Sequence, residues 1–286
     1  MISIDECRKS ELQKTAVIAC QGVEGAYSQM AANAIFSNPD ITYMRTFDGV
    51  FRAVSQGLCQ YGILPLENSS AGSVTAVYDL MKAHHFYIVQ GVKVSISHVL
   101  LAKEKTDVRH INQVYTHEQA ARQCSRFFDE NQHIKIIECA NTAVAAQLVA
   151  QSDRTDIAAI ASENCASLYN LAVLSRNLQN SQNNFTRFIC ISKNCEIFDH
   201  SDKISLMLTL EHKVGALHET IKQFADLGLN LIKLESRPIA DTDFEFMFYF
   251  DLQASVESRD VYHLLLALEK NTKNFSFLGN YREISA

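Results

Sequence analysis

The order of apolar runs changes once along the chain, and this change constrains the fold more than any other feature. From Thr15 to about Lys193, short apolar runs alternate with helical patterns, which is typical of an α/β domain. The segment Asn194–Asp202 is polar and forms a candidate linker. Beyond it the pattern reads strand, helix, strand, strand, helix, strand. We therefore predict two domains, over residues 15–194 and 203–282.

The first domain contains two blocks of strands and helices, which predict two lobes. Its expected strands are Thr15–Cys20, Tyr61–Leu66, Tyr87–Val94, Ser97–Ala102, Ile134–Ile137, Asp156–Ser162 and Phe185–Ser192. Its expected helices are Gln29–Phe36, a helix that ends at Gly57, Val74–Ala83, His117–Phe128 and one from Asn141 to Ala150. Ser28, Asp48 and Asn141 are candidate N-caps. Polar residues at the strand exits of two α/β lobes predict a ligand cleft between the lobes.

The second domain reads as a ferredoxin-like βαββαβ unit. The predicted elements are Ile204–Leu210, Ala216–Asp226, Leu231–Glu235, Phe244–Leu252, Asp260–Lys270 and Phe275–Tyr281. Apolar and polar residues alternate along the first strand, which predicts that one of its faces is buried. By analogy with other domains of this order, a regulatory or dimerising role is expected.

Composition excludes several classes of protein. With a net charge of -6 over 286 residues, the chain lacks the basic excess of a general nucleic-acid binder. Because no apolar run approaches ~20 residues and the N-terminus is polar, we expect neither a membrane span nor a signal peptide, and hence a cytoplasmic protein. The eight cysteines are scattered without C-x-x-C, which favours reduced, buried thiols. The ten histidines show no ligand spacing, so no metal is expected.

Seven stretches, in their order and spacing, resemble the signatures of the prephenate dehydratase family. They are GVEGAYS (22–28), PLENSSAGSV (65–74), SHVLL (97–101), THEQAARQC (116–124), NTAVAA (141–146), AAIAS (158–162) and NNFTRF (183–188). The C-terminal block is similar to an ACT domain through GALHETI (215–221) and LESRP (234–238). The resemblance implies a periplasmic-binding-protein-like, two-lobed catalytic domain followed by an ACT regulatory domain. Two motifs depart from the family pattern, at Val23, Ala26, Tyr27, Thr116 and Glu118.

The activity implied by the resemblance is the decarboxylating dehydration of prephenate to phenylpyruvate in L-phenylalanine biosynthesis, without a cofactor or metal. The family places the donor to the leaving hydroxyl on the Thr of T-R-F, here Thr186. A threonine hydroxyl is a weak acid, so we interpret Thr186 as a hydrogen-bond donor or relay. A lone threonine in a strand is ordinary, but this one stands at a polar point of an apolar strand.

Two sets of residues are the candidates for the catalytic site. The candidate catalytic residues are Thr186, Asn68, Ser69, Glu67 and His117. The candidate substrate-binding residues are Ser28, Ser70, Thr116, Gln119, Asn141, Thr142, Arg187 and Phe188. Simpler readings remain open: capping for Ser28 and Asn141, a salt bridge for Arg187, and core packing for Phe188. His117 is either a proton relay or a partly buried histidine.

The family also binds free phenylalanine where two segments of the second domain meet across a subunit interface. Here these segments are Gly215–His218 and Glu235–Pro238, and the alternative is ordinary turn chemistry. The candidate effector residues are Gly215, Ala216, Leu217, His218, Asn230, Leu231, Glu235 and Ser236. The implied assembly is a homodimer or homotetramer with phenylalanine as allosteric effector.

Three other functions are alternatives. Arogenate, the transaminated analogue of prephenate, could be the substrate. A prephenate decarboxylase that does not aromatise its substrate uses the same scaffold, but lacks the full set around the catalytic threonine. A solute-binding protein also has two α/β lobes, but is normally exported. About fifteen residues precede the first predicted strand, so we expect no chorismate mutase domain.

Overall fold

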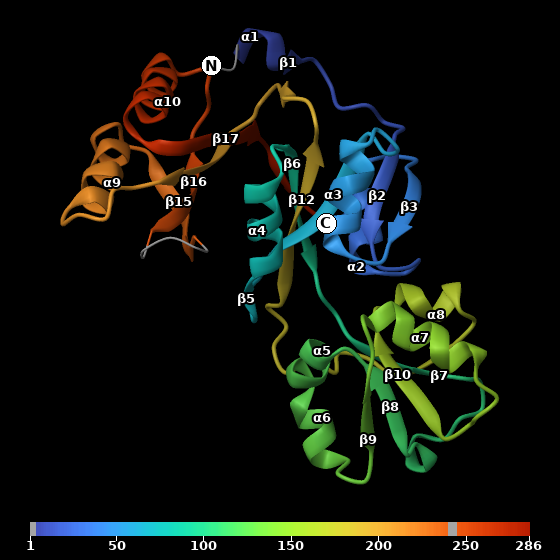
Figure 1. The fold of residues 1–286 in the computed structure, drawn as a ribbon. Coiled ribbons are helices and arrows are strands. Elements are labelled where there is room, and N and C mark those ends of the chain that lie inside the picture. The colour runs from blue at the N-terminus through green and yellow to red at the C-terminus, as the bar shows by residue number, and fades with distance from the viewer. Residues whose placement is uncertain (1–3, 240–244) are drawn as a thin grey trace. The chain divides into compact units, whose positions relative to one another are not determined.

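The computed structural model describes residues 4–239 and 245–286. The chain divides into two compact units, and neither is continuous in sequence. The first unit comprises residues 1–14, 78–91 and 189–284, and the second comprises residues 15–77, 92–188 and 285–286. Figure 1 shows the elements of both units along the chain. The domain boundaries expected from the sequence stay a prediction.

The first lobe of the second unit is built on parallel strands. Strand β2 (Val17–Gln21) pairs in parallel with β3 (Asp40–Met44) and with β4 (Tyr61–Asn68). The crossovers contain α2 (Tyr27–Ile35) and α3 (Phe47–Ser55). After β4 the chain turns through the short antiparallel strand β5 (Gly72–Ser73) into α4 (Thr75–Ala83). The predicted strands and helices of this lobe are therefore confirmed, whereas β3 had no prediction.

The second lobe has a five-stranded sheet in the order β11-β7-β10-β8-β9, coloured green in Figure 1. Strands β8 (Gln113–Thr116), β9 (Lys135–Glu138) and β10 (Ile157–Ala161) run in parallel, and β7 (Val99–Ala102) and β11 (Ala172–Ser175) complete the sheet with antiparallel pairs. Helices cover both faces, so successive residues of β7 and β10 enter two different apolar cores. These helices are α5 (Glu118–Gln123), α6 (Ser125–Glu130), α7 (Thr142–Gln151) and α8 (Asn164–Leu168).

The structure tests three predicted N-caps and the extent of one predicted helix. Asn141 caps α7 as expected, because its Oδ1 accepts from the N–H of Val144 at 2.8 Å. The predictions for Ser28 and Asp48 were wrong. Thr46 caps α3, and Ser28 lies within the first turn of α2, where its hydroxyl donates to the carbonyl of Gln21. The single helix predicted over residues 117–128 is broken at Cys124.

The first unit carries the predicted βαββαβ order. Its elements are β14 (Lys203–Thr209), α9 (Ala216–Asp226), β15 (Asn230–Pro238), β16 (Phe246–Gln253), α10 (Arg259–Asn271) and β17 (Lys273–Tyr281). The antiparallel sheet has the order β15-β16-β14-β17, which makes β15 an edge strand. Of the predicted strand Phe244–Leu252, Phe244 lies outside the described residues.

The prediction of one buried face for β14 was incomplete, because both faces are buried. Ile204, Leu206 and Leu208 enter the apolar core beneath α9 and α10. On the other face the Ser205 hydroxyl is fully buried and bonds the carboxylate of Asp251 and, at 2.8 Å, the hydroxyl of Tyr281. Polar side chains can be buried here because they bond one another.

The remaining elements are short, apart from two strands that cross the division between the units. These strands are β6 (Tyr87–Ser95) and β12 (Phe185–Ser192). Within the predicted linker, β13 (Ile197–Phe198) pairs with β1 (Arg8–Lys9), which follows α1 (Ile4–Cys7). The others are the 3-10 helix Val108–His110 and β18 (Glu283–Ser285). Among the described residues, no helix is long and apolar enough to cross a membrane.

Candidate active site

A cavity of about 460 Å³ in the second unit is lined by residues of both lobes. It collects eight of the predicted site residues: Ser28, Asn68, His117, Gln119, Asn141, Thr142, Thr186 and Phe188. The strand pattern explains why Thr186 and Phe188 are both present. They are two residues apart on β12 and therefore share one face of the sheet.

Thr186 is 9% exposed, and its hydroxyl is held by Asn68 at the end of β4. The Asn68 Nδ2 donates to Thr186 Oγ1 at 2.9 Å and to Asn184 Oδ1 at 3.0 Å. On the other side of the amide, Asn68 Oδ1 accepts from the backbone N–H groups of Ser70 and Ala71 at 3.0 and 2.9 Å. Because backbone N–H groups only donate, these two bonds fix which end of the Asn68 amide is the oxygen. The Thr186 oxygen is therefore a hydrogen-bond acceptor towards Asn68, and its own proton is available to the cavity.

The network continues into the second lobe through Gln123 on α5. Gln123 Oε1 lies 3.0 Å from Asn184 Nδ2 and 3.0 Å from the Nε2 of His98. His98 is 2% exposed and lies just before β7. Burial lowers the pKa of His98 below its ordinary value of 6.5, and the bond to Gln123 offsets part of this effect. His98 is therefore favoured as a neutral imidazole.

The described residues that line the cavity include no Asp, Glu, Lys or Arg. Four helices of nine or ten residues instead begin at its wall. Their first residues, or those just before them, line it: Tyr27 of α2, Phe47 of α3, Val74 before α4 and Thr142 of α7. The N-terminus of a helix carries unbonded N–H groups and a partial positive charge. The cavity is thus suited to a small anion although its described lining residues include no lysine or arginine.

Five predicted residues are not brought to the wall of this cavity: Glu67, Ser69, Ser70, Thr116 and Arg187. Thr116 is fully buried in β8, and its hydroxyl donates to the carbonyl of Ile160. Arg187 lies between Thr186 and Phe188, so its side chain points to the opposite face of β12. The Ser69 hydroxyl accepts from the N–H of Phe185 at 2.9 Å and thereby joins the end of β4 to the start of β12.

Several lining residues were not selected from the sequence, chiefly His98, Gln123 and Tyr27. The Tyr27 hydroxyl donates to the carbonyl of Ser97 at 2.5 Å, and burial raises the pKa of this phenol. Its ring meets the ring of His98 edge-on, with 6.2 Å between the centroids. All three residues lie inside stretches that carried the family resemblance: Tyr27 in a predicted turn, His98 in a predicted strand and Gln123 in a predicted helix. A signal was present at His98, since it is a polar residue at the entry to a buried strand.

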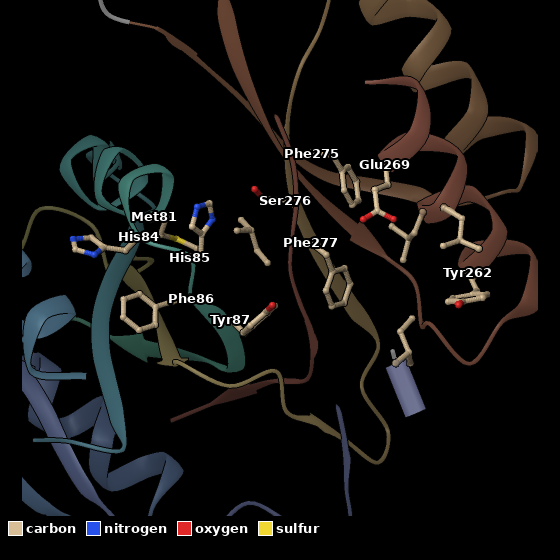
Figure 2. Close-up of a pocket in the computed structure, with 14 residues that line it drawn as sticks. Met81, His84, His85, Phe86, Tyr87, Tyr262, Glu269, Phe275, Ser276 and Phe277 are labelled. Carbon is tan, nitrogen blue, oxygen red and sulfur yellow. The ribbon is translucent and has the colours of Figure 1, made fainter. Parts of the chain in front are cut away.

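A second cavity, of about 260 Å³, lies entirely in the first unit and contains none of the predicted site residues. Figure 2 shows Met81 and His85 on one side, and Glu269 and Tyr262 from α10 on the other. Aromatic rings of Tyr87, Phe275 and Phe277 complete much of its wall. Its lining is therefore more aromatic than the described lining of the first cavity and, unlike it, includes a carboxylate, Glu269.

The candidate effector residues do not form one site within a single chain. Ala216 and Leu217 line a surface hollow of about 590 Å³ together with residues 210–214, Phe246 and Phe248. Met247 pairs with both Thr209 and Arg237, so the loop after β14 and the end of β15 lie at the same end of the strands. Asn230 pairs with Gln253 at the opposite end of the strands. Gly215 has φ +89° and precedes the first residue of α9.

Comparison with known proteins gives a consistent assignment. The family model described as prephenate dehydratase matches residues 18–196. The bifunctional chorismate mutase/prephenate dehydratase of Escherichia coli K12 is 34% identical over 275 residues, covering 93% of this chain and 71% of that protein. An Arabidopsis thaliana chloroplastic arogenate dehydratase/prephenate dehydratase is 35% identical over 280 residues, covering 92% of this chain and 71% of that protein.

Solved structures show the same fold. A prephenate dehydratase from Arthrobacter aurescens, in complex with L-Phe, has a TM-score of 0.84 at 26% identity and covers 93% of this chain and 90% of its own. A protein described as GqqA, a quorum-quenching acylase, has a TM-score of 0.83 at 26% identity and covers 93% of this chain and 97% of its own. The fold and the site are those of a two-lobed α/β lyase. The chain belongs to the prephenate dehydratase family.

Proposed function

We propose that this protein converts prephenate to phenylpyruvate, carbon dioxide and water, as a step in the biosynthesis of L-phenylalanine. The observation that carries the proposal is the Thr186 hydroxyl. It lies on the wall of a cavity whose described lining includes no Asp, Glu, Lys or Arg, and it accepts from Asn68, so that its proton can be donated to a bound ligand. This chemistry agrees with the role that the resemblance implies for the threonine of T-R-F. It also agrees with the names of the family and of the similar proteins.

The reaction needs one proton and no electrons from outside. The bond between the ring carbon and the hydroxyl breaks, and the oxygen leaves with the electron pair. The bond between the ring and its carboxylate breaks in the opposite sense, and this pair completes the aromatic ring as carbon dioxide leaves. One proton converts the departing hydroxide to water. A donor on the leaving oxygen typically accelerates such a step by ~10²–10⁴-fold.

Prephenate is a dianion, and the cavity supports its binding through helix N-termini rather than through lysine or arginine side chains. Asn141 and Thr142 stand at the start of α7, and Ser28 stands in the first turn of α2. N–H groups at these positions can donate to carboxylates without the tight ion pairs that would hold substrate and product equally. Phe188 contributes an apolar surface for the ring.

Arogenate is the second candidate substrate, because one of the similar plant proteins is named for both activities. Arogenate carries an ammonium group where prephenate has a keto group, and a buried ammonium requires an acidic or carbonyl partner. The described lining residues include no carboxylate, which favours prephenate.

An acylase activity is not supported by the geometry of the hydroxyls in the cavity. Acyl transfer requires a nucleophile that is hydrogen-bonded to a base. The Ser28 hydroxyl donates to the backbone carbonyl of Gln21, and the Thr186 hydroxyl accepts from the amide of Asn68. Neither bond activates its oxygen as a nucleophile.

We further propose that residues 15–194 form the catalytic domain and residues 203–282 an ACT domain that binds phenylalanine as an allosteric inhibitor. A homodimer or homotetramer through this domain is supported by the edge strand β15, which exposes Ile232 and Leu234. The eight cysteines form no disulfide among the described residues, and seven of them are buried, which supports a reducing cytoplasmic location.

The test is incubation of the purified protein with prephenate and, separately, with arogenate, while the aromatic product is followed. Phenylpyruvate from prephenate, formed faster than phenylalanine from arogenate at equal concentration, is the expected result. An acyl-amide substrate serves as the negative control. No aromatic product from either cyclohexadienol would refute the proposal.

A further inference from the structure

His98 is a buried histidine with one ring nitrogen bonded and the other without a partner. Its Nε2 lies 3.0 Å from Gln123 Oε1, and its backbone N–H donates to Gln179 Oε1 at 2.9 Å. Its Nδ1 is buried and has no hydrogen-bond partner among the described residues. His98 also lines the cavity that contains Thr186.

The tautomer of His98 follows from a chain of bonds that begins at the backbone. Asn68 Oδ1 accepts from the N–H groups of Ser70 and Ala71, so Asn68 Nδ2 faces Asn184 Oδ1. Asn184 then presents its Nδ2 to Gln123 Oε1. An amide oxygen only accepts, so the Nε2 of His98 carries the proton and Nδ1 carries a lone pair.

The same chain sets the direction of the Thr186 hydroxyl. Gln123 completes it, because its Nε2 lies 3.4 Å from Asn68 Oδ1. The Asn68 oxygen is fixed by the backbone N–H groups of Ser70 and Ala71, and Asn184 and Gln123 hold the same amide through two further bonds. If Gln123 were free to turn, Asn184 could turn with it, and Asn68 would lose both of these further bonds. The Asn68 amide would then hold the Thr186 hydroxyl in a less defined position.

We propose that His98 is a positioning residue for the proposed dehydration: its Nε2–H holds Gln123, and through Gln123, Asn184 and Asn68 it keeps the Thr186 hydroxyl directed at the substrate. The inference rests on the proposed function for its effect on turnover. The Nε2–H tautomer of His98, which the inference also requires, does not depend on any substrate.

Packing alone does not explain a histidine at this position. A buried acceptor without a partner costs about 1–3 kcal/mol, whereas an apolar side chain of similar volume would fill the space without that cost. The edge-on contact with Tyr27 would be available to a phenylalanine as well. What only a donor-bearing side chain supplies here is the proton to Gln123.

The experiment combines three variants with a control. His98→Leu removes the donor, and His98→Gln restores an N–H at a comparable distance from the backbone. The third variant is the double variant of His98→Leu with Thr186→Ala. The control is Thr106→Val, because Thr106 is another buried residue of the second unit whose side-chain oxygen has no partner, and it does not line the cavity. Unfolding curves are recorded for each variant.

The expected result is a kcat about 10–100-fold lower in His98→Leu, with KM changed much less, and recovery of most of the loss in His98→Gln. In the Thr186→Ala background, His98→Leu should cause little further loss, because both act through one hydroxyl. Thr106→Val should retain the parent kcat. An additive loss in the double variant, or a His98→Gln enzyme as slow as His98→Leu, would overturn the inference.

Nuclear magnetic resonance separates this inference from the proposed function. In ¹⁵N-labelled wild-type protein without ligand, His98 should show the Nε2–H pattern at neutral pH. A ring protonated at Nδ1 would overturn the inference even if the enzyme consumes prephenate. Absence of turnover by the wild type would instead refute the proposed function, and the tautomer would still be measured.

Discussion

The side-chain amide of Asn68 donates to the hydroxyl of Thr186 across 2.9 Å, from the end of β4 to the start of β12. The two residues are 118 positions apart in the sequence. The bond makes Thr186 an acceptor on one side, which leaves its proton as the only donor that it can offer to a ligand. A weakly acidic hydroxyl is used here for its direction rather than for its acidity.

Asn68→Asp tests this relationship with almost no change in shape. A carboxylate cannot donate to Thr186 Oγ1, so the hydroxyl would turn to donate to the new carboxylate instead of to the substrate. We expect kcat to fall by about 10²-fold or more with KM changed less. Ser69→Ala is the matched control, because Ser69 joins the same two strands without touching Thr186. Equal losses in both variants would show that strand connection, and not the direction of the hydroxyl, was important.

Thr186→Ala should lower turnover by ~10²–10⁴-fold while the protein remains folded, because it removes the donor without opening a large cavity. Thr186→Ser keeps the hydroxyl and should retain more activity than Thr186→Ala. Steady-state kinetics with prephenate, together with circular dichroism, check both expectations. If the serine and alanine variants lose the same amount, the methyl group and its packing are the essential part.

The buried His98 predicts a loss of stability in mild acid. Its pKa in the folded protein lies below the 6.5 expected in the unfolded chain, so below pH 6.5 the unfolded chain binds a proton that the folded protein does not. The free energy of unfolding should therefore fall as pH drops from about 6.5 to the lower folded pKa. The loss is about 1.4 kcal/mol for each unit between the two pKa values. Denaturant unfolding of wild type and His98→Gln, measured from pH 7.5 to 4.5, checks this. Parallel curves would contradict it.

The strands and most helices could be predicted from sequence because their signals are local. β12 was predicted with the observed bounds, since its apolar residues mark a strand despite the polar Thr186 and Arg187 within it. The break at Cys124 was missed because every residue between Glu118 and Glu130 is compatible with a continuous helix. Strands β3 and β8 were missed because polar residues dilute their short apolar runs.

Residues of the candidate site were predicted where polar side chains stand at strand ends. They were missed where their position in the site depends on contacts with the other lobe. Asn68 follows this rule, whereas Thr186 was selected through the resemblance to the family's T-R-F motif. His98 and Gln123 become site residues only because two lobes bring them to Asn184, which no local pattern encodes. Arg187 shows the reverse error, since alternation along β12 directs it away from the cavity that its neighbours line.

Gly279→Ala should strongly destabilise the first unit. Gly279 has φ +144° and sits at an irregularity where β17 pairs with β14, and a Cβ there would lie 2.1 Å from the carbonyl oxygen of Ile88. Backbone cannot move aside as a flexible side chain can, so a large loss, of more than about 2 kcal/mol, is expected. Gly57→Ala is the control. It also has positive φ, at +74°, but nothing within 4 Å, and should cost about 1 kcal/mol. Similar unfolding midpoints for the two variants would refute the steric argument.

Phenylalanine should bind away from the Thr186 cavity and inhibit. The segment Gly215–His218 presents the N-terminus of α9, which suits the ligand's carboxylate, and Glu235 on the edge strand β15 suits its ammonium. By the family resemblance, we expect these segments to meet across the interface between two copies of the chain. Linkage then requires that phenylalanine and prephenate weaken each other's binding by the same factor, typically ~5–150-fold.

Phenylalanine is titrated calorimetrically into the Thr186→Ala enzyme, which turns over slowly, with and without saturating prephenate. This titration measures the effect of prephenate on phenylalanine binding. Titration of prephenate into Thr186→Ala with and without phenylalanine measures the reciprocal effect. Gly215→Val should abolish phenylalanine binding, because valine disfavours the φ of +89° that starts α9. Gly228→Val imposes a similar backbone strain, at φ +68°, at the far end of α9, and should leave binding intact. Two outcomes would place the effector in the catalytic cavity and remove the basis for a regulatory second domain. In the first, phenylalanine binds Gly215→Val as well as it binds wild type. In the second, phenylalanine competes with prephenate in Thr186→Ala and no ternary complex is measurable.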